Sequence, residues 1–356
     1  MTVSTPSALG YRMPAEWEPH EATWLAWPHE RRDWPGKLSP IPWVYGEVVR
    51  HLSPGERVRI LVKDAAMERK ARALLLRVGV ELGQLDFFRI PTDRSWTRDF
   101  CPLFVKGRDG RVGLTNWRFN GWAKYANHKK DAAVGDRLAA RLGKSHWTPT
   151  VTDDQGRARR VVLEGGSIDV DGRGTLLTTE ECLLSPVQAR NPGLSREKLE
   201  ALIGAHLGVR KVLWLGDGIV GDDTHGHVDD LARFVGEATV VIAAESDPAD
   251  ANFEKLRENR RRLDAMTDAA GRALRVVPLP MPAPVVLDGV RLPASYANFY
   301  IGNAAVLVPT FNDPNDRRAL AIVAELFPTR KVVGIHAVDL VWGLGTLHCM
   351  TQQQPA

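Results

Sequence analysis

Four short segments, widely separated in the chain, carry side chains that could act together in catalysis. The thiol of Cys349 stands close to the end of the sequence, and an imidazole and a carboxylate occur together at His227 and Asp229. Two further carboxylates, Asp99 and Glu164, come from separate segments. A thiolate is a nucleophile, and an imidazole can activate it and transfer protons. The combination indicates acid/base chemistry at a shared cavity.

Each of these residues also has a purely structural interpretation. A cysteine after an apolar residue commonly packs in a core, although the glycines before Cys349 and the polar stretch after it indicate a tail folded back on the molecule. Asp99 could pair with neighbouring Arg98 or cap a turn, and Glu164 could be a solvated acid at the end of a strand. Taken together, Asp99 and Glu164 are better explained as acids that line a pocket.

The densest group of functional side chains is the run from Thr224 to Asp230, and it admits two chemical interpretations. Its Thr-His-X-His-X-Asp-Asp pattern resembles the metal-binding run of the metallo-β-lactamase superfamily, which would make the chain a zinc-dependent hydrolase using His225 and His227. Alternatively, His227 and Asp229 lie on one face of a strand, because residues two apart point the same way. They would then form an acid/base and its charge partner without a metal. A pair of surface histidines in an acidic loop is the structural interpretation.

Composition narrows the class of protein. The 356 residues are 44% hydrophobic, enough for a large core, and no low-complexity linker divides them, which predicts one domain over residues 1–356. Lys and Arg exceed Asp and Glu by 47 to 43, but they are scattered, so no nucleic-acid partner is expected. No apolar run reaches the ~18 residues that a membrane span requires, and no secretory signal is visible.

The three cysteines make no disulfide framework, so a cytoplasmic location is expected. Besides Cys349 they are Cys101 and Cys182, which are interpreted as packing residues. The sequence leaves the oligomeric state open, and a homo-oligomer is compatible with it.

The elements that must position these residues follow a repeated order. Five helix-like segments begin near residues 65, 131, 195, 251 and 316, at intervals of about 55 to 66 residues. Each is followed by a β-rich run, at 85–90, 161–163, 211–215, 274–279 and 331–335. The paired runs 167–170 and 175–178 predict a hairpin. Five strand-strand-helix-strand units that cover one another's apolar faces would close into a ring, which predicts an α/β fold.

With these segments assembled, the chain resembles the agmatine deiminase family of the guanidino-group-modifying enzymes, the pentein superfamily, nearly from end to end. The resemblance implies a five-bladed α/β propeller with its active site in a central cavity, in agreement with the fivefold spacing. The motifs that carry it occur in the family's order: Met13–His20, Trp24–Pro28, Trp96–Asp99, Phe119–Tyr125, Leu163–Leu184, Gly226–Asp229, Ser295–Tyr300 and His348–Gln353.

The resemblance implies a role for each of the five candidate catalytic residues. Cys349 would be the nucleophile and His227 the general acid/base. Asp99 and Asp229 would bind the guanidinium, and Glu164 would hold both His227 and the substrate. The implied reaction converts agmatine to N-carbamoylputrescine and ammonia, a step towards putrescine and polyamines. It would proceed through a covalent thiouronium intermediate, with no cofactor and no metal.

The rest of the substrate-binding site is less specific. Because the far end of agmatine is an ammonium, Trp96 and Asp223 are candidates for binding it, and Asn298 is a third candidate substrate-binding residue. A carboxylate-bearing substrate would instead need a cation such as Arg118 or Arg190, which keeps a peptidylarginine or other arginine-analogue deiminase as an alternative. A catalytically silent protein that only binds cationic ligands is the non-enzyme alternative.

Overall fold

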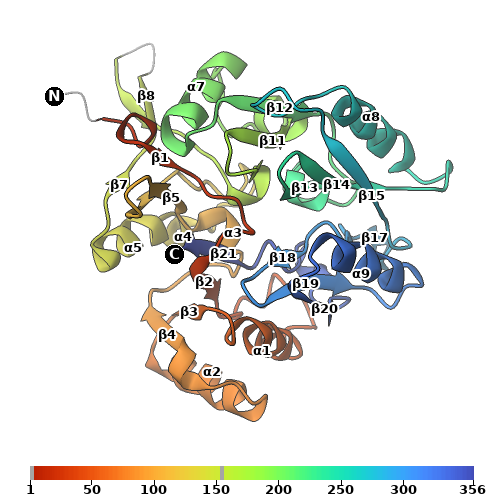
Figure 1. The fold of residues 1–356 in the computed structure, drawn as a ribbon. Helices are drawn as coiled ribbons and strands as arrows, with labels where there is room; N and C mark the ends of the chain where they lie inside the picture. The colour runs from red at the N-terminus through yellow and green to blue at the C-terminus, as the bar shows by residue number, and fades with distance from the viewer. Residues whose placement is uncertain (1–3, 153–155) are drawn as a thin grey trace.

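Mixed β-sheets covered by helices make up the fold (Figure 1). The computed structural model describes residues 4–152 and 156–356. Within these ranges five sheets have three or four strands each, and none of them closes on itself. Their strand orders are β21 (Gln352–Pro355), β2 (His20–Ala26), β3 (Arg57–Val62), β4 (Leu85–Arg89); β1 (Tyr11–Arg12), β5 (Leu103–Gly107), β6 (Val112–Thr115), β7 (His146–Trp147); β10 (Asp169–Val170), β11 (Thr175–Thr179), β12 (Lys211–Leu215); β13 (Ala232–Gly236), β14 (Thr239–Ala244), β15 (Arg275–Pro280); and β18 (Tyr300–Ile301), β19 (Ala305–Thr310), β20 (Lys331–His336).

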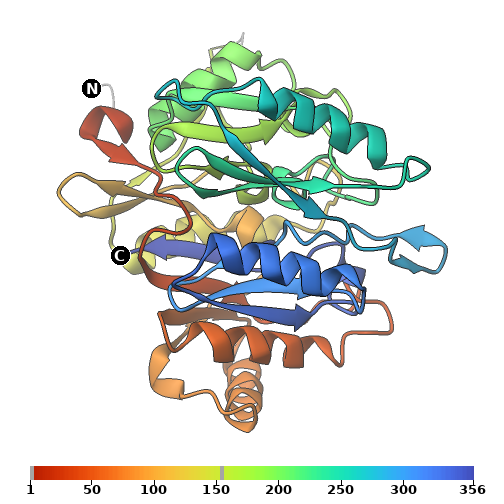
Figure 2. The same ribbon diagram turned by 45° about the vertical axis from the view of Figure 1, so that its right-hand side comes forward.

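The five sheets share one connectivity. In each, one strand pairs antiparallel on one side and parallel on the other, as β11 does with β10 and β12. A parallel pair needs a crossover connection, and helices supply it. The crossover helices are α1 (Ile41–Leu52), α2 (Ala65–Arg77), α4 (Lys129–Ala132), α5 (Val134–Leu142), α6 (Glu180–Leu184), α7 (Arg196–Leu207), α8 (Phe253–Asp264) and α9 (Asn315–Leu326). The predicted strand-strand-helix-strand unit is therefore present, as Figure 2 illustrates for α8 and α9.

The local signals for helix ends act as the sequence predicts. The Ser195 side chain accepts a hydrogen bond from the backbone N–H of Lys198 at the start of α7, and Gly208 ends that helix with φ 72°. Asp64 caps α2 in the same way. Helix α1 is absent from the predicted set, although Pro42 lies in its first turn, where a missing N–H costs no intrahelical bond.

One predicted strand is wrong. Residues 161–163 form only an isolated bridge between Val162 and Arg118, and the neighbouring strand β9 (Ala158–Arg160) pairs with β8 (Thr150–Thr152). The side chain of Asn191 takes the place of a strand partner, because it accepts from the N–H of Val162 and donates to its carbonyl, at 2.9 and 2.8 Å. Glu164 follows this segment, so its position depends on the two hydrogen bonds between the Asn191 side chain and Val162.

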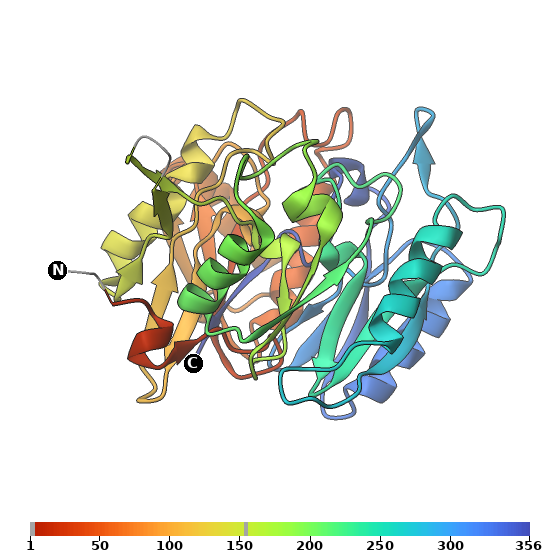
Figure 3. The same cartoon turned by 90° about the horizontal axis from the view of Figure 1, so that it is seen from above.

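The hairpin of β16 (Val286–Leu287) and β17 (Val290–Arg291) projects from the body of the molecule (Figures 2 and 3). Val290 at its end contributes to the pocket described below. Among the described residues, none of the helices combines the length and the apolar character needed to cross a membrane.

Candidate active site

One pocket of about 410 Å³ gathers residues from several of the predicted segments. The thiol-bearing Cys349 and the acid Asp99 line it, together with Trp96 and Asp223. This volume is typical of small-molecule sites. The other lining residues are Arg32, Asp33, Pro35, Arg94, Trp122, Tyr125, Asn127, Thr224, Val290, Leu292, Trp342, Gly343, Leu344 and Gly345.

The tail that carries Cys349 is folded back, as predicted. Strand β21 lies antiparallel to β2, and the two are seen side by side near the middle of Figure 1. The short helix α3 (Thr97–Phe100) holds the tail from the other side. The Arg98 N–H donates to the Cys349 carbonyl at 3.1 Å, and the Thr97 hydroxyl donates to that of Met350 at 2.6 Å. The nucleophile candidate and Asp99 therefore sit on segments bonded to each other.

Asn298 contacts the thiol directly. Its side-chain N–H donates to Sγ of Cys349 at 3.2 Å, and its carbonyl oxygen accepts from the Thr346 hydroxyl at 2.7 Å. The same oxygen accepts from the backbone N–H of His348 at 3.0 Å. Asn298 is fully buried, and both ends of its amide are engaged, by the Cys349 thiol and by the turn before it.

His227 and Asp229 do not lie on a strand, contrary to the sequence prediction. Val228–Asp230 form the 3-10 helix η4, which begins directly after His227. The cause is the carboxylate of Asp222, which accepts from the N–H groups of Gly226 and His227 at 2.7 and 2.9 Å, groups that a strand would give to its neighbour. His227 Nδ1 and Asp229 Oδ1 nevertheless lie 3.9 Å apart, so the predicted pairing is present.

Three carboxylates surround the His227 imidazole. Its Nδ1 lies 3.8 Å from Asp99 Oδ1, and its Nε2 lies 3.9 Å from Glu164 Oε2. Close approach requires Gly166, because a Cβ there would lie 2.6 Å from Nδ1 of His227 and 2.9 Å from Oδ1 of Asp99. The backbone N–H of this glycine also donates to Asp99 at 3.0 Å. The Glu-Gly-Gly-Ser motif thus supplies both an acid and the space for its neighbours.

Several of these polar atoms have no partner within the described residues. They are both ring nitrogens of His227, Oε2 of Glu164 and Oδ1 of Asp229, and all are buried. Buried polar atoms normally have a hydrogen-bond partner, and leaving one without costs about 1–3 kcal/mol. The unpartnered oxygens of Glu164 and Asp229 can each accept a hydrogen bond from a donor that enters the site.

The electrostatics of the site depend on burial and on the clustered acids. Burial raises the pKa of Asp99 to about 6, and the charges of Asp229 and Glu164 add to this while His227 opposes it. Burial alone would lower the pKa of His227, but the charge of Asp99 and contacts with Cys182 and Asp229 raise it well above its ordinary value.

The pKa of the thiol is raised like that of the imidazole, but for a thiol this shift disfavours the charged form. Burial raises the pKa of Cys349 well above its ordinary value, and the charges of Asp229, Asp230 and Asp99 raise it further. A negative charge on sulfur is therefore unfavourable until a cation enters among the acids.

Asp229 is held ionised by a chain of buried groups that the sequence prediction missed. His348 Nδ1 lies 2.7 Å from Asp229 Oδ2, and His348 Nε2 lies 2.8 Å from Glu16 Oε2. Glu16 in turn pairs with Arg233 at 2.9 Å. Burial acts to raise the pKa of Asp229, but the His348 hydrogen bond and charge lower it below its ordinary value. Both Glu16 and His348 fall inside the motifs that carry the family resemblance.

The two candidates for the far end of the substrate differ in their surroundings. Trp96 is buried against Trp34, with ring centroids 5.3 Å apart. Asp223 is partly exposed and already bound: the ammonium of Lys124 pairs with one oxygen and the Tyr125 hydroxyl donates to the other at 2.7 Å. A substrate ammonium at Asp223 would therefore compete with Lys124 for it.

Three other predicted residues lie outside the catalytic group. His225 contacts Ser185 Oγ at 3.1 Å and is not brought together with His227 in a metal-binding cluster of the described chain. Arg118 is exposed. Arg190 is buried and pairs through Nε with Glu164 Oε1 at 3.0 Å, so its guanidinium orients an acid of the site.

Comparison with known proteins agrees with this geometry. The family model for Porphyromonas-type peptidyl-arginine deiminases matches residues 12–355. An agmatine deiminase of Pseudomonas fluorescens is 37% identical over an alignment of 376 positions, which covers 99% of this chain and 98% of that protein. The agmatine deiminase of Ectopseudomonas mendocina has the same identity and coverage.

Solved structures extend the likeness to the fold. A structure of the Enterococcus faecalis agmatine deiminase superposes with a TM-score of 0.90 at 34% identity, covering 100% of this chain and 98% of that one. An amidinotransferase from Microseira wollei, only 12% identical, has a TM-score of 0.54 and shares the mixed α/β fold alone. The family resemblance inferred from the sequence motifs is confirmed, and the chain belongs to the Porphyromonas-type peptidyl-arginine deiminase family.

Proposed function

We propose that this chain hydrolyses the guanidino group of agmatine, giving N-carbamoylputrescine and ammonia. The observation that carries the proposal is the meeting of the Cys349 thiol, the His227 imidazole and three carboxylates around unpartnered buried polar atoms. The full-length relatives described above are named for this activity. A metal or cofactor is not part of the proposed reaction.

The acids bind and orient the substrate. A guanidinium is planar, carries several N–H donors and stays protonated, so Asp99 and Asp229 can hold it by charge-assisted hydrogen bonds. Glu164, whose Oε1 is fixed by Arg190, would accept from the substrate or from His227 through its unpartnered Oε2. Fixing the plane presents the central carbon to the sulfur of Cys349.

Substrate binding itself activates the nucleophile. Two of the three acids that raise the pKa of Cys349 in the free protein, Asp99 and Asp229, are the groups whose charge a guanidinium would offset. The thiol proton is lost to solvent, and the thiolate attacks the guanidinium carbon and forms the C–S bond. His227, whose raised pKa favours its protonated form, gives a proton to the departing nitrogen, and the C–N bond breaks to release ammonia.

Hydrolysis of the thiouronium intermediate completes the cycle. His227, now neutral, takes a proton from water, and the hydroxide oxygen attacks the same carbon. The C–S bond breaks, the hydroxyl proton of the adduct is lost to solvent, the thiolate of Cys349 is regenerated and the neutral ureido product leaves. Because the acids remain in place throughout, one imidazole can serve as acid in the first half and base in the second.

The test of this function is a ureido-product assay across agmatine, arginine and a peptide ending in arginine. We expect agmatine to have the highest kcat/KM, because neither basic residue named for a substrate carboxylate is free in the pocket. Arg190 is bound to Glu164, and Arg118 does not line the pocket. A preference for either carboxylate-bearing substrate would transfer the assignment to an arginine-analogue deiminase.

The Asp223→Asn variant tests how the far end of the substrate is recognised. We expect it to weaken agmatine capture by ~1.5 to 3 kcal/mol, the range for a hydrogen bond to a charged group, with little effect on an alkylguanidine lacking the amine. The measurement is kcat/KM for both substrates. The matched control is Lys124→Met, which removes the competing ammonium and should improve agmatine capture. Equal losses for the two substrates in Asp223→Asn would mean that Asp223 does not bind the amine.

The pH profile tests the guanidinium-binding acid. We expect kcat/KM to fall as the pH drops through about 6, because Asp99 must be ionised to bind a guanidinium and burial raises its pKa to about 6. The Trp122 indole donates to Asp99 Oδ2 at 2.8 Å and favours the ionised form, so Trp122→Phe should move the acid limb to higher pH. The control is Trp117→Phe, a buried indole that bonds Thr115 instead. An unmoved limb in Trp122→Phe would assign it to another group.

We further propose that the five sheets are the blades of a five-bladed propeller around the catalytic cavity, within one domain over residues 1–356. The shared connectivity of the sheets supports this arrangement, as does the pairing of β21 with β2, which joins the two ends of the chain. We assign the protein to the cytoplasm, since its three cysteines are free thiols.

A further inference from the structure

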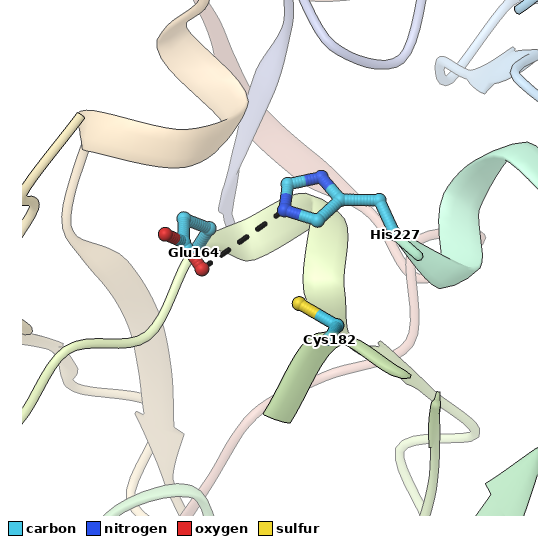
Figure 4. A group of neighbouring side chains, drawn as sticks. All are labelled: Glu164, Cys182 and His227. Carbon is cyan, nitrogen blue, oxygen red and sulfur yellow. Dashed lines mark ion pairs between the residues drawn. The ribbon is translucent and has the colours of Figure 1, made fainter. Parts of the chain in front are cut away.

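A second thiol lies beside the catalytic imidazole. Cys182, interpreted from the sequence as a packing residue, is fully buried on α6, and its Sγ lies within 4.8 Å of the ligand atoms of His227 and Glu164 (Figure 4). His227 Nε2 and Glu164 Oε2 are 3.9 Å apart. Neither atom has a hydrogen-bond partner in the described parts of the chain. The mechanism above uses the imidazole and the acid but has no role for this thiol.

The three side chains are fixed by separate elements. Thr179 caps α6 by accepting from the backbone N–H of Cys182 at 3.1 Å, and its hydroxyl donates to the Gly226 carbonyl at 2.5 Å. This double contact ties the helix to the loop that carries His227. Arg190 holds Oε1 of Glu164 and leaves Oε2 directed towards the imidazole. The group is therefore pre-organised, as a binding site requires.

Sulfur, imidazole nitrogen and carboxylate oxygen form a donor set that suits a thiophilic divalent cation. Zn²⁺ binds all three at about 2.0–2.3 Å in tetrahedral sites, with water in the fourth position where the protein supplies three ligands. A thiolate and a carboxylate would neutralise its charge.

We propose that Glu164, Cys182 and His227 form an inhibitory site for a thiophilic divalent cation such as Zn²⁺. Coordination occupies the imidazole lone pair and Oε2 of Glu164, so His227 can no longer transfer protons. Coordination displaces the protons of the thiol and of the imidazolium to solvent. Binding stands on the geometry alone, whereas the inhibitory effect rests on the proposed function.

A second cluster of possible metal ligands could bind the same cation. Ligand atoms of Asp229, Asp230 and Cys349 also lie within 4.8 Å of one another. This cluster has no imidazole, and Asp229 is already bonded to His348. We therefore expect the cation at the Cys182 cluster, and the two sites can be told apart because each contains a different thiol.

The binding test uses Co²⁺ as a spectroscopic probe on the Cys349→Ser protein. A thiolate-to-cobalt absorption that saturates at one ion per chain is expected. It should persist when Cys101→Ser is added as the buried-thiol control, and disappear when Cys182→Ser is added. Absorption that survives without Cys182, or no absorption in the Cys349→Ser protein, would overturn the proposal. Circular dichroism checks that each variant is folded, and Cys182→Ala replaces Cys182→Ser if the latter is not.

The activity test uses Zn²⁺ on the protein with Cys349 intact. We expect reversible inhibition of agmatine hydrolysis that a chelator removes, and at least about a tenfold higher half-inhibiting concentration in Cys182→Ala but not in Cys101→Ala. Equal inhibition of Cys182→Ala would assign the metal to the other cluster, and activity that requires zinc would favour the hydrolase alternative. Cobalt binding through Cys182 in a protein with no agmatine hydrolysis would overturn the function and leave the metal site standing.

Discussion

Replacing Cys349 with serine is expected to lower kcat for agmatine by about 10⁴-fold or more, the scale seen when a catalytic nucleophile is removed. A hydroxyl is far less acidic than a thiol, and the acids around residue 349 oppose any negative charge there. The substrate cation can offset those charges for a thiolate but cannot ionise an alcohol to the same degree. Steady-state ammonia release measures the loss, and calorimetry measures whether agmatine still binds.

The matched control for this prediction is Cys101→Ser. Cys101 is also buried, and it directly follows α3, but it does not line the pocket. We expect it to retain kcat with some loss of stability. Substantial turnover by Cys349→Ser would exclude the covalent route, and a loss of agmatine binding in that variant would point to a disturbed site instead of a missing nucleophile.

Replacing His227 with glutamine is expected to lower kcat by about 10²–10⁴-fold, the usual contribution of a positioned acid/base. The amide fills part of the space of the ring but cannot exchange protons with the leaving nitrogen or with water. Because the same group also activates water, the thiouronium adduct on Cys349 should persist in any chain that completes the first half-reaction. Quenched reactions examined by intact-mass spectrometry would detect it.

His225→Asn is the control for the histidine variant. His225 lies two residues away in the same loop but faces Ser185 and Glu181, so we expect only a modest change in kcat. If His225→Asn were as damaging as His227→Gln, the loop as a whole would matter more than the imidazole. Near-normal turnover by His227→Gln would require another proton carrier, and His348, bonded to Asp229, would be the first to consider.

Local sequence signals predicted much of the fold. Capping residues such as Ser195 and the C-terminal Gly208 act over a single turn, so they can be recognised without knowledge of the tertiary structure. The prediction of a 161–163 strand failed because both backbone groups of its central residue, Val162, bond to a side chain, that of Asn191, about thirty positions further along the chain. The periodicity of the local sequence gives no sign of hydrogen bonds to a distant side chain.

The sequence predicted which residues make up the candidate site better than it predicted how they are arranged. Motifs identified Asp99, His227 and Cys349, but the strand assigned to His227 and Asp229 was wrong, because the competing acceptor is the side chain of Asp222. The sequence also could not show which residues far apart in the chain contact the candidate site residues. The Lys124 ammonium that binds Asp223 and the Cys182 thiol beside the imidazole are brought in by tertiary contacts alone.

Gathering acids around one imidazole has a consequence for folding. Asp99, Glu164 and Asp229 are buried within reach of the same ring, and their mutual repulsion, offset only in part by the His227 imidazolium, opposes the folded state until a further cation lies among them. Removing one of these charges would relieve that repulsion and at the same time weaken guanidinium capture. The substrate therefore acts as a ligand that stabilises the fold, and the protein's resistance to unfolding rises with the supply of the molecule it consumes.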